Sequence, residues 1–479
     1  MIRCMEQLFD YVNQHSEEYI QRLREAVALD SVSADPCKRS RCVDMAHYIC
    51  EWIERLEGKA LVKHIGKQKF ADGQVLDYPP VIFGDFCVDP HRPVVLAYCH
   101  YDVQPADIQD GWKFNPFELT EEQGKLYGRG ATDDKGPLLD WLWAIEAHRQ
   151  LGIPLPVNLV LCFEGMEESG SFGLDKVIEE ESKGLLSRVK YVCITDNYWL
   201  TEHRPCLTYG LRGIVFFQVH IRGPQMDLHS GLFGGLIHEP LNDLIHLLHT
   251  LTDSQGNILI PKVMDSVAPV TKEEESIYER ILFDTEQLRK EAGQVSQLRE
   301  SDKVKVLMNR WRFPSLSFHG IQGAFSGQGE KTVIPCAVTG KFSIRLVPHQ
   351  QPQEIAHHVE QFLKQQFDQF HSGNELQVEW RGASPWLGDY HNSNFTAARL
   401  AFKKVYQVEP DLTREGGSIP ITNTFQEYLG GEICLIPLGS PDDGAHSQNE
   451  KMNKHNYIEG IKVIIAYMDE LAKQISYQY

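Results

Sequence analysis

One short apolar run of the chain ends on residues that can bind a metal ion: Val94-Val95-Leu96-Ala97-Tyr98-Cys99-His100-Tyr101-Asp102. Three further strand-like runs end in the same way: residues 157–163 lead to Glu167 and Glu168, residues 191–194 to Asp196, and residues 433–438 to the loop that carries His446. In open α/β sheets, ligands bind in the crevice outside the carboxyl ends of the strands. The four runs therefore predict one binding site at a single edge of a parallel sheet.

The length of the chain and the pattern of its apolar segments predict two domains of different architecture. At 479 residues the chain is too long for one ordinary core. From residue 81 to residue 208, apolar runs alternate with helix-like segments, which is typical of a mostly parallel sheet with helices on both faces. After residue 211 the pattern changes to half-alternating strands, such as 214–222, and to helices, including a strongly charged one over 273–292.

We therefore predict an α/β fold with two domains. Residues 1–211 and 386–479 form a domain with a mostly parallel central sheet flanked by helices, and residues 212–385 form an inserted α+β domain. Residues that build one site at the edge of the central sheet must then come from positions far apart in the sequence.

Composition narrows the function classes. Lys plus Arg number 47 and Asp plus Glu 66, so the net charge is −19, and nucleic acid is not an expected partner because phosphate binding needs a positive surface. No segment is apolar for long enough to span a bilayer, and the first residues do not resemble a signal peptide, so no membrane partner is expected. The 11 cysteines, an odd number without a C-x-x-C pair, favour reduced thiols and a cytoplasmic location.

His100 and Asp102 lie two residues apart at a predicted strand end, where alternation places both side chains on one face. The carboxylate could then accept the imidazole N–H and fix the tautomer, as is typical of metal-bound histidine. Taken alone, the pattern H-x-D is common by chance and fits a solvated loop better. The other runs are what favour a metal ligand.

Adjacent acids stand at two further places. In Gly128-Arg129-Gly130-Ala131-Thr132-Asp133-Asp134-Lys135-Gly136, flanking glycines indicate a tight backbone that presents an aspartate inward, although an acidic helix start near Pro137 would give the same letters. Glu167 and Glu168 could divide the roles of base and metal ligand, or they could be an exposed acidic helix start.

The combined set suits two metal ions. Two histidines and at least three carboxylates are ligands for borderline ions such as zinc or manganese. Two ions about 3.5–4 Å apart share one carboxylate and can hold a hydrolytic water between them. A P-loop and a G-x-S-x-G motif are both absent from the sequence, which disfavours serine acyl chemistry.

Four motifs resemble the co-catalytic metallopeptidases of the aminoacylase and carnosinase group, and the likeness extends over nearly the whole chain. They are His100-Tyr101-Asp102-Val103-Gln104-Pro105, the segment 128–136 with its paired aspartates, Phe163-Glu164-Gly165-Met166-Glu167-Glu168-Ser169-Gly170-Ser171, and Asp443-Gly444-Ala445-His446-Ser447-Gln448-Asn449-Glu450. The resemblance implies two divalent ions per subunit, Mn²⁺ or Zn²⁺, one held by His100, Asp133 and Asp196, the other by Asp133, Glu168 and His446. It also implies that Glu167 is the general base, that Asp102 orients His100, and that the Asp133–Asp134 peptide bond is cis.

The same resemblance makes the inserted domain a lid and dimerisation domain. His229 would reach the active site of the neighbouring subunit in a homodimer and polarise the scissile carbonyl, a role that the residues alone would not suggest for a turn histidine. Arg345 would bind the C-terminal carboxylate of a small peptide substrate. The full set of implied substrate contacts is Glu167, Asp196, His229, Thr332, Arg345, Ser418 and His446.

One position departs from the family pattern: Cys99 stands where a glycine usually precedes the first metal histidine. We expect the ligand His100 to be retained. The leading hypothesis is a dimetal hydrolase of dipeptides with a free C-terminus. The alternatives are an amidohydrolase acting on N-acyl amino acids and a catalytically silent metal-binding scaffold, and the intact Glu167 argues against the second.

Overall fold

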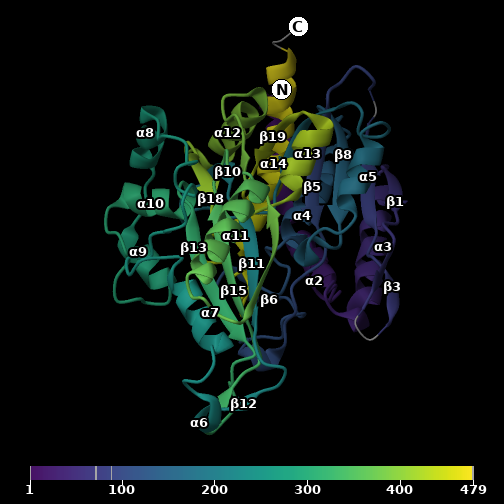
Figure 1. Cartoon of the computed structure of the whole chain (residues 1–479). Coiled ribbons are helices and arrows are strands. Elements are labelled where there is room, and N and C mark those ends of the chain that lie inside the picture. Colours follow the sequence, from purple (N-terminus) through teal and green to yellow (C-terminus); the bar gives the residue numbers. More distant parts are fainter. Residues whose placement is uncertain (1, 71–72, 88, 477–479) are drawn as a thin grey trace. The chain divides into compact units, whose positions relative to one another are not determined.

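A computed structural model describes residues 2–70, 73–87 and 89–476 of the chain (Figure 1). The chain divides into two compact units. The first comprises residues 1–209, 388–413 and 421–479, and the second comprises residues 210–387 and 414–420. Each unit has its own sheet and its own helices.

The first unit is built on a mixed sheet whose strands run in the order β1-β4-β8-β5-β9-β19-β10, with β18 also paired to β10. Pairing is parallel among β8, β5, β9 and β19, and it is antiparallel between β1 and β4, between β4 and β8, and between β19 and β10. The predicted α/β class is confirmed, and the parallel strands are the four runs that lead to candidate ligands. The strand bounds are β1 Lys59–Lys63, β4 Val81–Asp85, β5 Val94–His100, β8 Asn158–Glu164, β9 Val189–Ile194, β10 Cys206–Leu211, β18 Asp411–Glu415 and β19 Glu432–Leu435.

β19 is shorter than the apolar run that predicts it. The strand ends at Leu435, although Ile436 still donates its backbone N–H to Ile194 at 2.9 Å. Pro437 follows and has no N–H to continue the ladder. Regular pairing therefore stops here, and an isolated parallel bridge between Gly439 and Tyr198 follows before the loop that carries His446.

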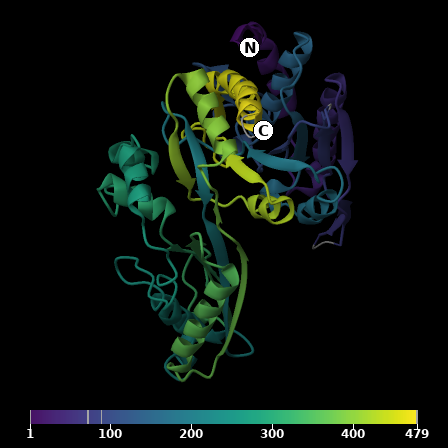
Figure 2. The same cartoon turned by 90° about the horizontal axis from the view of Figure 1, so that it is seen from above.

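Helices cover both faces of this sheet. On one face, Trp141 of the helix α4, which is buried from Lys135 to His148, donates its indole N–H to Thr195 at 3.2 Å, and α4, α12 and α14 pack together (Figure 1, Figure 2). On the other face, the ring of Tyr98 contacts Phe425 of α13. The helix bounds are α1 Ile2–Gln14, α2 Ser16–Val27, α3 Arg39–Arg55, α4 Lys135–Gln150, α5 Leu174–Glu181, α12 Ser393–Tyr406, α13 Ile421–Leu429 and α14 Lys454–Ser476. Small β-ladders join β2 Lys67–Lys69 to β3 Val75–Asp77, and β20 Lys451–Asn453 to β7 Lys125–Tyr127 and β6 Thr120–Glu122.

The second unit contains a four-stranded antiparallel sheet in the order β13-β15-β11-β16, with α7 and α11 packed on it (Figure 1). Burial alternates along β11, as the half-alternating pattern predicts. The strands are β11 Gly213–Arg222, β13 Ser315–Gln322, β15 Ala337–Leu346 and β16 Glu375–Ala383, with the short strands β12 Leu228–His229, β14 Val333–Ile334 and β17 Trp386–Leu387. The helices are α6 Ser230–Phe233, α7 Pro240–His249, α8 Lys272–Arg280, α9 Thr285–Glu291, α10 Lys303–Trp311 and α11 Pro352–Asp368.

The single charged helix predicted over 273–292 is wrong. Two helices, α8 and α9, occupy this segment, and the chain is extended at Ile281 between them. Ile281 is buried, and the side chain of Asp284 caps α9 by accepting the N–H of Glu286 at 2.9 Å. A buried apolar residue followed by a capping aspartate interrupts the helix, and charge periodicity does not reveal it.

Within residues 2–70, 73–87 and 89–476, no helix has both the length and the apolar character that crossing a membrane requires. All eleven cysteines have free thiols, as predicted. The cytoplasmic location stays a prediction.

We expect Phe342→Ala to lower the free energy of unfolding by about 3–5 kcal/mol, because a fully buried ring is removed. The Phe342 side chain is 0% exposed and stacks on Phe217 with ring centroids 4.8 Å apart. Denaturant unfolding monitored by circular dichroism measures the change. Phe325→Ala is the control, because that ring is 46% exposed and its loss should change stability by only about 0.5 kcal/mol.

Candidate metal centre

His100 is fixed from three sides at the end of β5. Its backbone N–H donates to Asp134 Oδ2 at 3.2 Å, and its Nδ1 lies 3.0 Å from the backbone oxygen of Asp102. Its Nε2 lies 3.0 Å from Asp133 Oδ1. The imidazole is 0% exposed, so its orientation is set by the fold and only Nε2 is presented to the centre.

Asp102 is placed beside His100 as predicted, but its carboxylate has closer partners. Asp102 Oδ1 lies 3.5 Å from His100 Nδ1. The same carboxylate accepts the backbone N–H groups of Glu167 at 3.1 Å and Glu168 at 3.2 Å. Asp102 therefore ties the end of β5 to the short 3₁₀ helix η3 (Glu167–Ser169) that carries both glutamates.

Asp133 lies between two histidines from distant parts of the chain. Its Oδ1 faces His100 Nε2, and its Oδ2 lies 3.1 Å from His446 Nε2. On one side, Asp196 Oδ1 lies 3.6 Å from His100 Nε2, and on the other, Glu168 Oε2 lies 3.0 Å from His446 Nε2. The structure thus brings all five predicted metal-binding residues together, with one carboxylate oxygen of Asp133 on each side.

The paired aspartates have different tasks. The Asp133–Asp134 peptide bond is cis, which confirms the expectation from the resemblance. Asp134 occupies the N-cap position of α4, yet its side chain makes no capping hydrogen bond and instead accepts the His100 N–H. An acidic helix start therefore does not account for the pair.

The centre carries an excess of buried negative charge. Burial, followed by neighbouring acids, raises the pKa of Asp134 and Glu167 well above the ordinary range. Hydrogen bonds to Asp133 and Glu168 raise the pKa of His446 to about 11. Across the described part of the chain, no lysine or arginine forms an ion pair with the acids of the centre, which are Asp102, Asp133, Asp134, Glu167, Glu168 and Asp196. This donor set fits divalent cations, which would supply the missing positive charge.

Sequence reasoning missed two contacts of the centre. Gln104 donates its side-chain N–H to Glu168 Oε2 at 2.8 Å, and Thr132 donates its hydroxyl to Asp443 Oδ2 at 2.7 Å. Gln104 lies inside the motif that begins at His100, so the motif was the available signal. Cys99, the departure from the family pattern, is fully buried with its Sγ 3.0 Å from Thr195 Oγ1, and burial raises the pKa of its thiol.

The remaining predicted residues lie in the second unit. Exposed His229 accepts the Gly231 N–H on Nδ1 at 3.0 Å, and the backbone oxygen of Thr332 accepts the Ser230 N–H at 3.2 Å. Arg345 donates to Ser418 Oγ at 3.3 Å, and burial lowers the pKa of its guanidinium. Within this unit the structure therefore pairs Arg345 with Ser418 and places His229 on the segment that meets Thr332.

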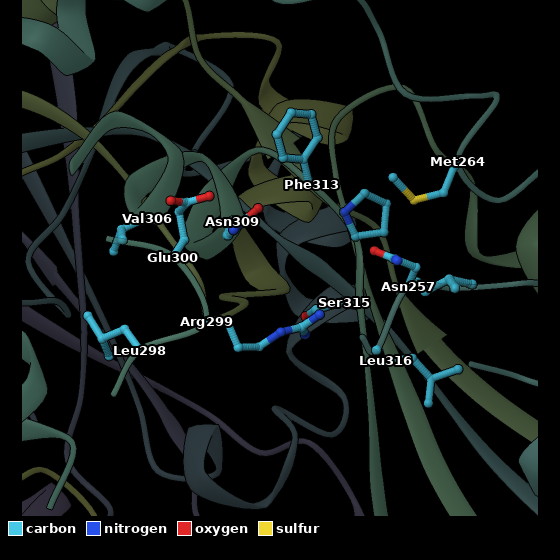
Figure 3. A pocket seen from close by; sticks show the side chains of 13 residues that line it. Asn257, Met264, Leu298, Arg299, Glu300, Val306, Asn309, Phe313, Ser315 and Leu316 are labelled. Atoms are coloured by element: carbon cyan, nitrogen blue, oxygen red, sulfur yellow. The ribbon is translucent and has the colours of Figure 1, made fainter. Parts of the chain in front are cut away.

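A hollow of about 610 Å³ in the second unit is a different feature (Figure 3). Arg299, Asn309 and Phe313 are among the residues that line it, and Figure 3 shows the Arg299 side chain reaching toward Ser315. None of the predicted site residues lines this hollow. The candidate metal centre is therefore defined by strand ends and loops rather than by this cavity.

Comparison with known proteins agrees with this geometry. Residues 96–470 match the sequence model of the family described as Peptidase family M20/M25/M40, and the chain belongs to this family. It is 47% identical over 475 residues to a Cys-Gly metallodipeptidase of Candida albicans, covering 98% of each chain. It is 44% identical over 472 residues to the human Beta-Ala-His dipeptidase, covering 98% of this chain and 93% of the relative.

A solved structure supports the same assignment. The di-peptidase Dug1p from Saccharomyces cerevisiae superimposes with a TM-score of 0.89 at 44% sequence identity, covering 98% of both chains. Because the two chains are similar in sequence and in structure along almost their full length, this chain has the fold of the family.

Removing divalent ions should destabilise the protein, because the buried acids lose their counter-charge. At a free ion concentration of 100 times the dissociation constant, each ion is expected to add about 2.7 kcal/mol to the free energy of unfolding. The test compares the thermal unfolding temperature with and without EDTA, with sodium chloride added to match the ionic strength.

The pH dependence of the metal-free protein gives a second measure. Raised pKa values of Asp134 and Glu167 mean that the folded state binds more protons than the unfolded state, so stability is greatest at low pH and falls as pH rises from about 4, the ordinary pKa of a carboxyl group, toward neutral pH. Stability that rises over this range in the metal-free protein would contradict the charge excess.

Proposed function

We propose that the protein is a dimetal dipeptidase that hydrolyses small peptides with a free C-terminus. The single observation that carries the proposal is the placement of Asp133, with one carboxylate oxygen toward His100 and the other toward His446. One carboxylate shared between two ligand sets is the arrangement that a pair of closely spaced ions requires. Membership of the peptidase family and the named relatives support the reaction class.

We assign one ion to His100, Asp133 and Asp196, and the other to Asp133, Glu168 and His446. The ligands are nitrogen and carboxylate oxygen, which suit Mn²⁺ or Zn²⁺. When bound, such ions supply Lewis acidity, which lowers the pKa of water and polarises a carbonyl oxygen. Asp102 and Asp134 orient the ligands through the hydrogen bonds to His100 and to η3.

Glu167 is the general base of the proposed reaction. It neighbours the ligand Glu168, and its backbone N–H donates to Asp102 at 3.1 Å, which holds this part of η3 beside the centre. Beside the ligand Glu168, this carboxylate can accept a proton from water. The same group can then return that proton to the leaving amine.

The second unit supplies substrate recognition in this proposal. Arg345, with Ser418 beside it, binds the C-terminal carboxylate, because a planar guanidinium can form two hydrogen bonds to a carboxylate. His229 polarises the scissile carbonyl, and Thr332 contributes a further contact. Glu167, Asp196 and His446 of the first unit are the other proposed substrate contacts.

The substrate preference separates this proposal from the amidohydrolase alternative. Cys-Gly and β-Ala-His are the first dipeptides to assay, because two relatives carry these names. Faster turnover of N-acetyl amino acids than of any dipeptide would favour an acylase. If metal-loaded protein hydrolysed neither kind of substrate, the result would favour a catalytically silent metal-binding scaffold.

We also propose a homodimer, formed through the second unit. β13 is an edge strand of its sheet, so one side of its backbone has no partner in that sheet. Phe318 on β13 and Ile245 on α7 are 48% and 50% exposed, and both line an apolar hollow of about 310 Å³. An apolar surface beside an unpaired strand edge is typical of an association surface.

Glu167→Gln should reduce kcat by about 100-fold to 10,000-fold while both ions remain bound, because an amide cannot accept the proton. Metal content and dipeptide hydrolysis are measured on the same preparation. Glu180→Gln, at an exposed position of α5, is the matched control and should leave kcat unchanged. Loss of a metal ion from the Glu167 variant would instead place Glu167 among the ligands.

Mixing His229→Ala chains with Glu167→Gln chains should restore partial activity. In a mixed dimer, one site has an intact Glu167 from the first chain and an intact His229 from the second. Tagged heterodimers are purified and assayed against each parent homodimer. If verified heterodimers are as inactive as both parents, the active site is not shared between subunits.

A further inference from the structure

Glu450 is a buried acid that the proposed reaction does not use. Its side chain is 0% exposed, and it lies four residues after His446. Its two oxygens accept four hydrogen bonds from the loop that carries Asp133: Oε1 from the backbone N–H groups of Gly130 at 3.0 Å, Thr132 at 3.2 Å and Asp133 at 3.2 Å, and Oε2 from Arg129 Nη1 at 2.7 Å. One side chain therefore binds three backbone N–H groups and the guanidinium of this loop.

Other hydrogen bonds join the same two segments, which are some 320 residues apart in sequence. The backbone oxygen of Glu450 accepts the Gly128 N–H at 2.9 Å, and Arg129 Nη2 donates to the backbone oxygen of Ser447 at 3.1 Å. Arg129 also lies over the ring of Trp112, 5.1 Å from its centroid. Glu450 is thus the centre of a clamp between the loop 128–133 and the loop 443–451.

His446 depends on this clamp more than the other histidine does. His100 sits at the end of a fully buried strand and is 0% exposed, whereas the His446 side chain is 58% exposed and its backbone is left-handed, with φ of 62°. No strand ladder fixes His446. Its distances of 3.1 Å to Asp133 and 3.0 Å to Glu168 therefore depend on how the loop that carries it is held.

We propose that Glu450 is a positioning residue that sets the affinity of the ion site built from Asp133, Glu168 and His446. It holds the backbone of Asp133 and the loop of His446 at a fixed separation, and the site of His100 and Asp196 depends on it much less. The inference rests on the proposed two-ion function, and it adds a residue that touches neither an ion nor substrate.

The test is titration of metal-stripped protein with Zn²⁺ by calorimetry, without any activity assay. Wild type should show two sites. In Glu450→Ala the affinity of one site should fall by about 10-fold to 100-fold, the range for residues that support metal ligands, so that one ion is retained at limiting zinc. His446→Ala provides the reference signature for loss of that site.

Glu450→Gln guards against a folding failure. The amide oxygen can still accept the three backbone N–H groups, so this variant should fold and show a smaller loss at the same site. Glu274→Gln is the matched control: Glu274 is a buried acid of the second unit, 2.6 Å from Arg414 and 3.0 Å from Arg312, and its loss should leave both zinc affinities unchanged.

Two results would overturn the proposal. One is unchanged affinity at both sites in Glu450→Ala and Glu450→Gln. The other is an equal loss at both sites, which would indicate a general structural role. Wild-type protein that binds fewer than two zinc ions would overturn the proposed two-ion function itself, and with it this inference.

Discussion

The shared carboxylate of Asp133 is the constraint on which the centre depends. His100 and His446 are far apart in the sequence, and each lies about 3 Å from a different oxygen of the Asp133 side chain. Burying several acids around that carboxylate is unfavourable unless positive charge is supplied. These acids lie at the carboxyl ends of four parallel strands, where the residues that follow each strand lie at the same edge of the sheet.

Some parts of the fold and of the ligand set could be predicted from the sequence, and others could not. Apolar runs of the right length identify β5, β8 and β9, and their ends identify His100 and Asp196, because the run and the residue that follows it are both local features of the sequence. Asp133 has no such run before it, and its assignment came from the family resemblance. The antiparallel flanks of the sheet were not predicted, since the apolar pattern of a strand does not encode the direction of its neighbour.

The supporting hydrogen bonds lie beyond sequence reasoning for a different physical reason. Asp102 accepts the N–H groups of Glu167 and Glu168, and Asp134 accepts that of His100. These bonds join a side chain to the backbone of another segment, so their existence depends on tertiary packing and on no spacing within a motif. The same holds for Glu450, which the motif includes without indicating what it contacts.

The division of the chain into two units has a consequence for specificity. All the acids and histidines of the centre belong to the first unit, while Arg345, Ser418, His229 and Thr332 belong to the second. Relatives named for Cys-Gly and for β-Ala-His are 47% and 44% identical to this chain, so overall identity does not distinguish the two dipeptides. If the proposed roles hold, the chemistry of bond cleavage is common to such enzymes. Dipeptide preference then depends on the second unit, where the residues that surround Arg345 can change without disturbing the ligands of the first.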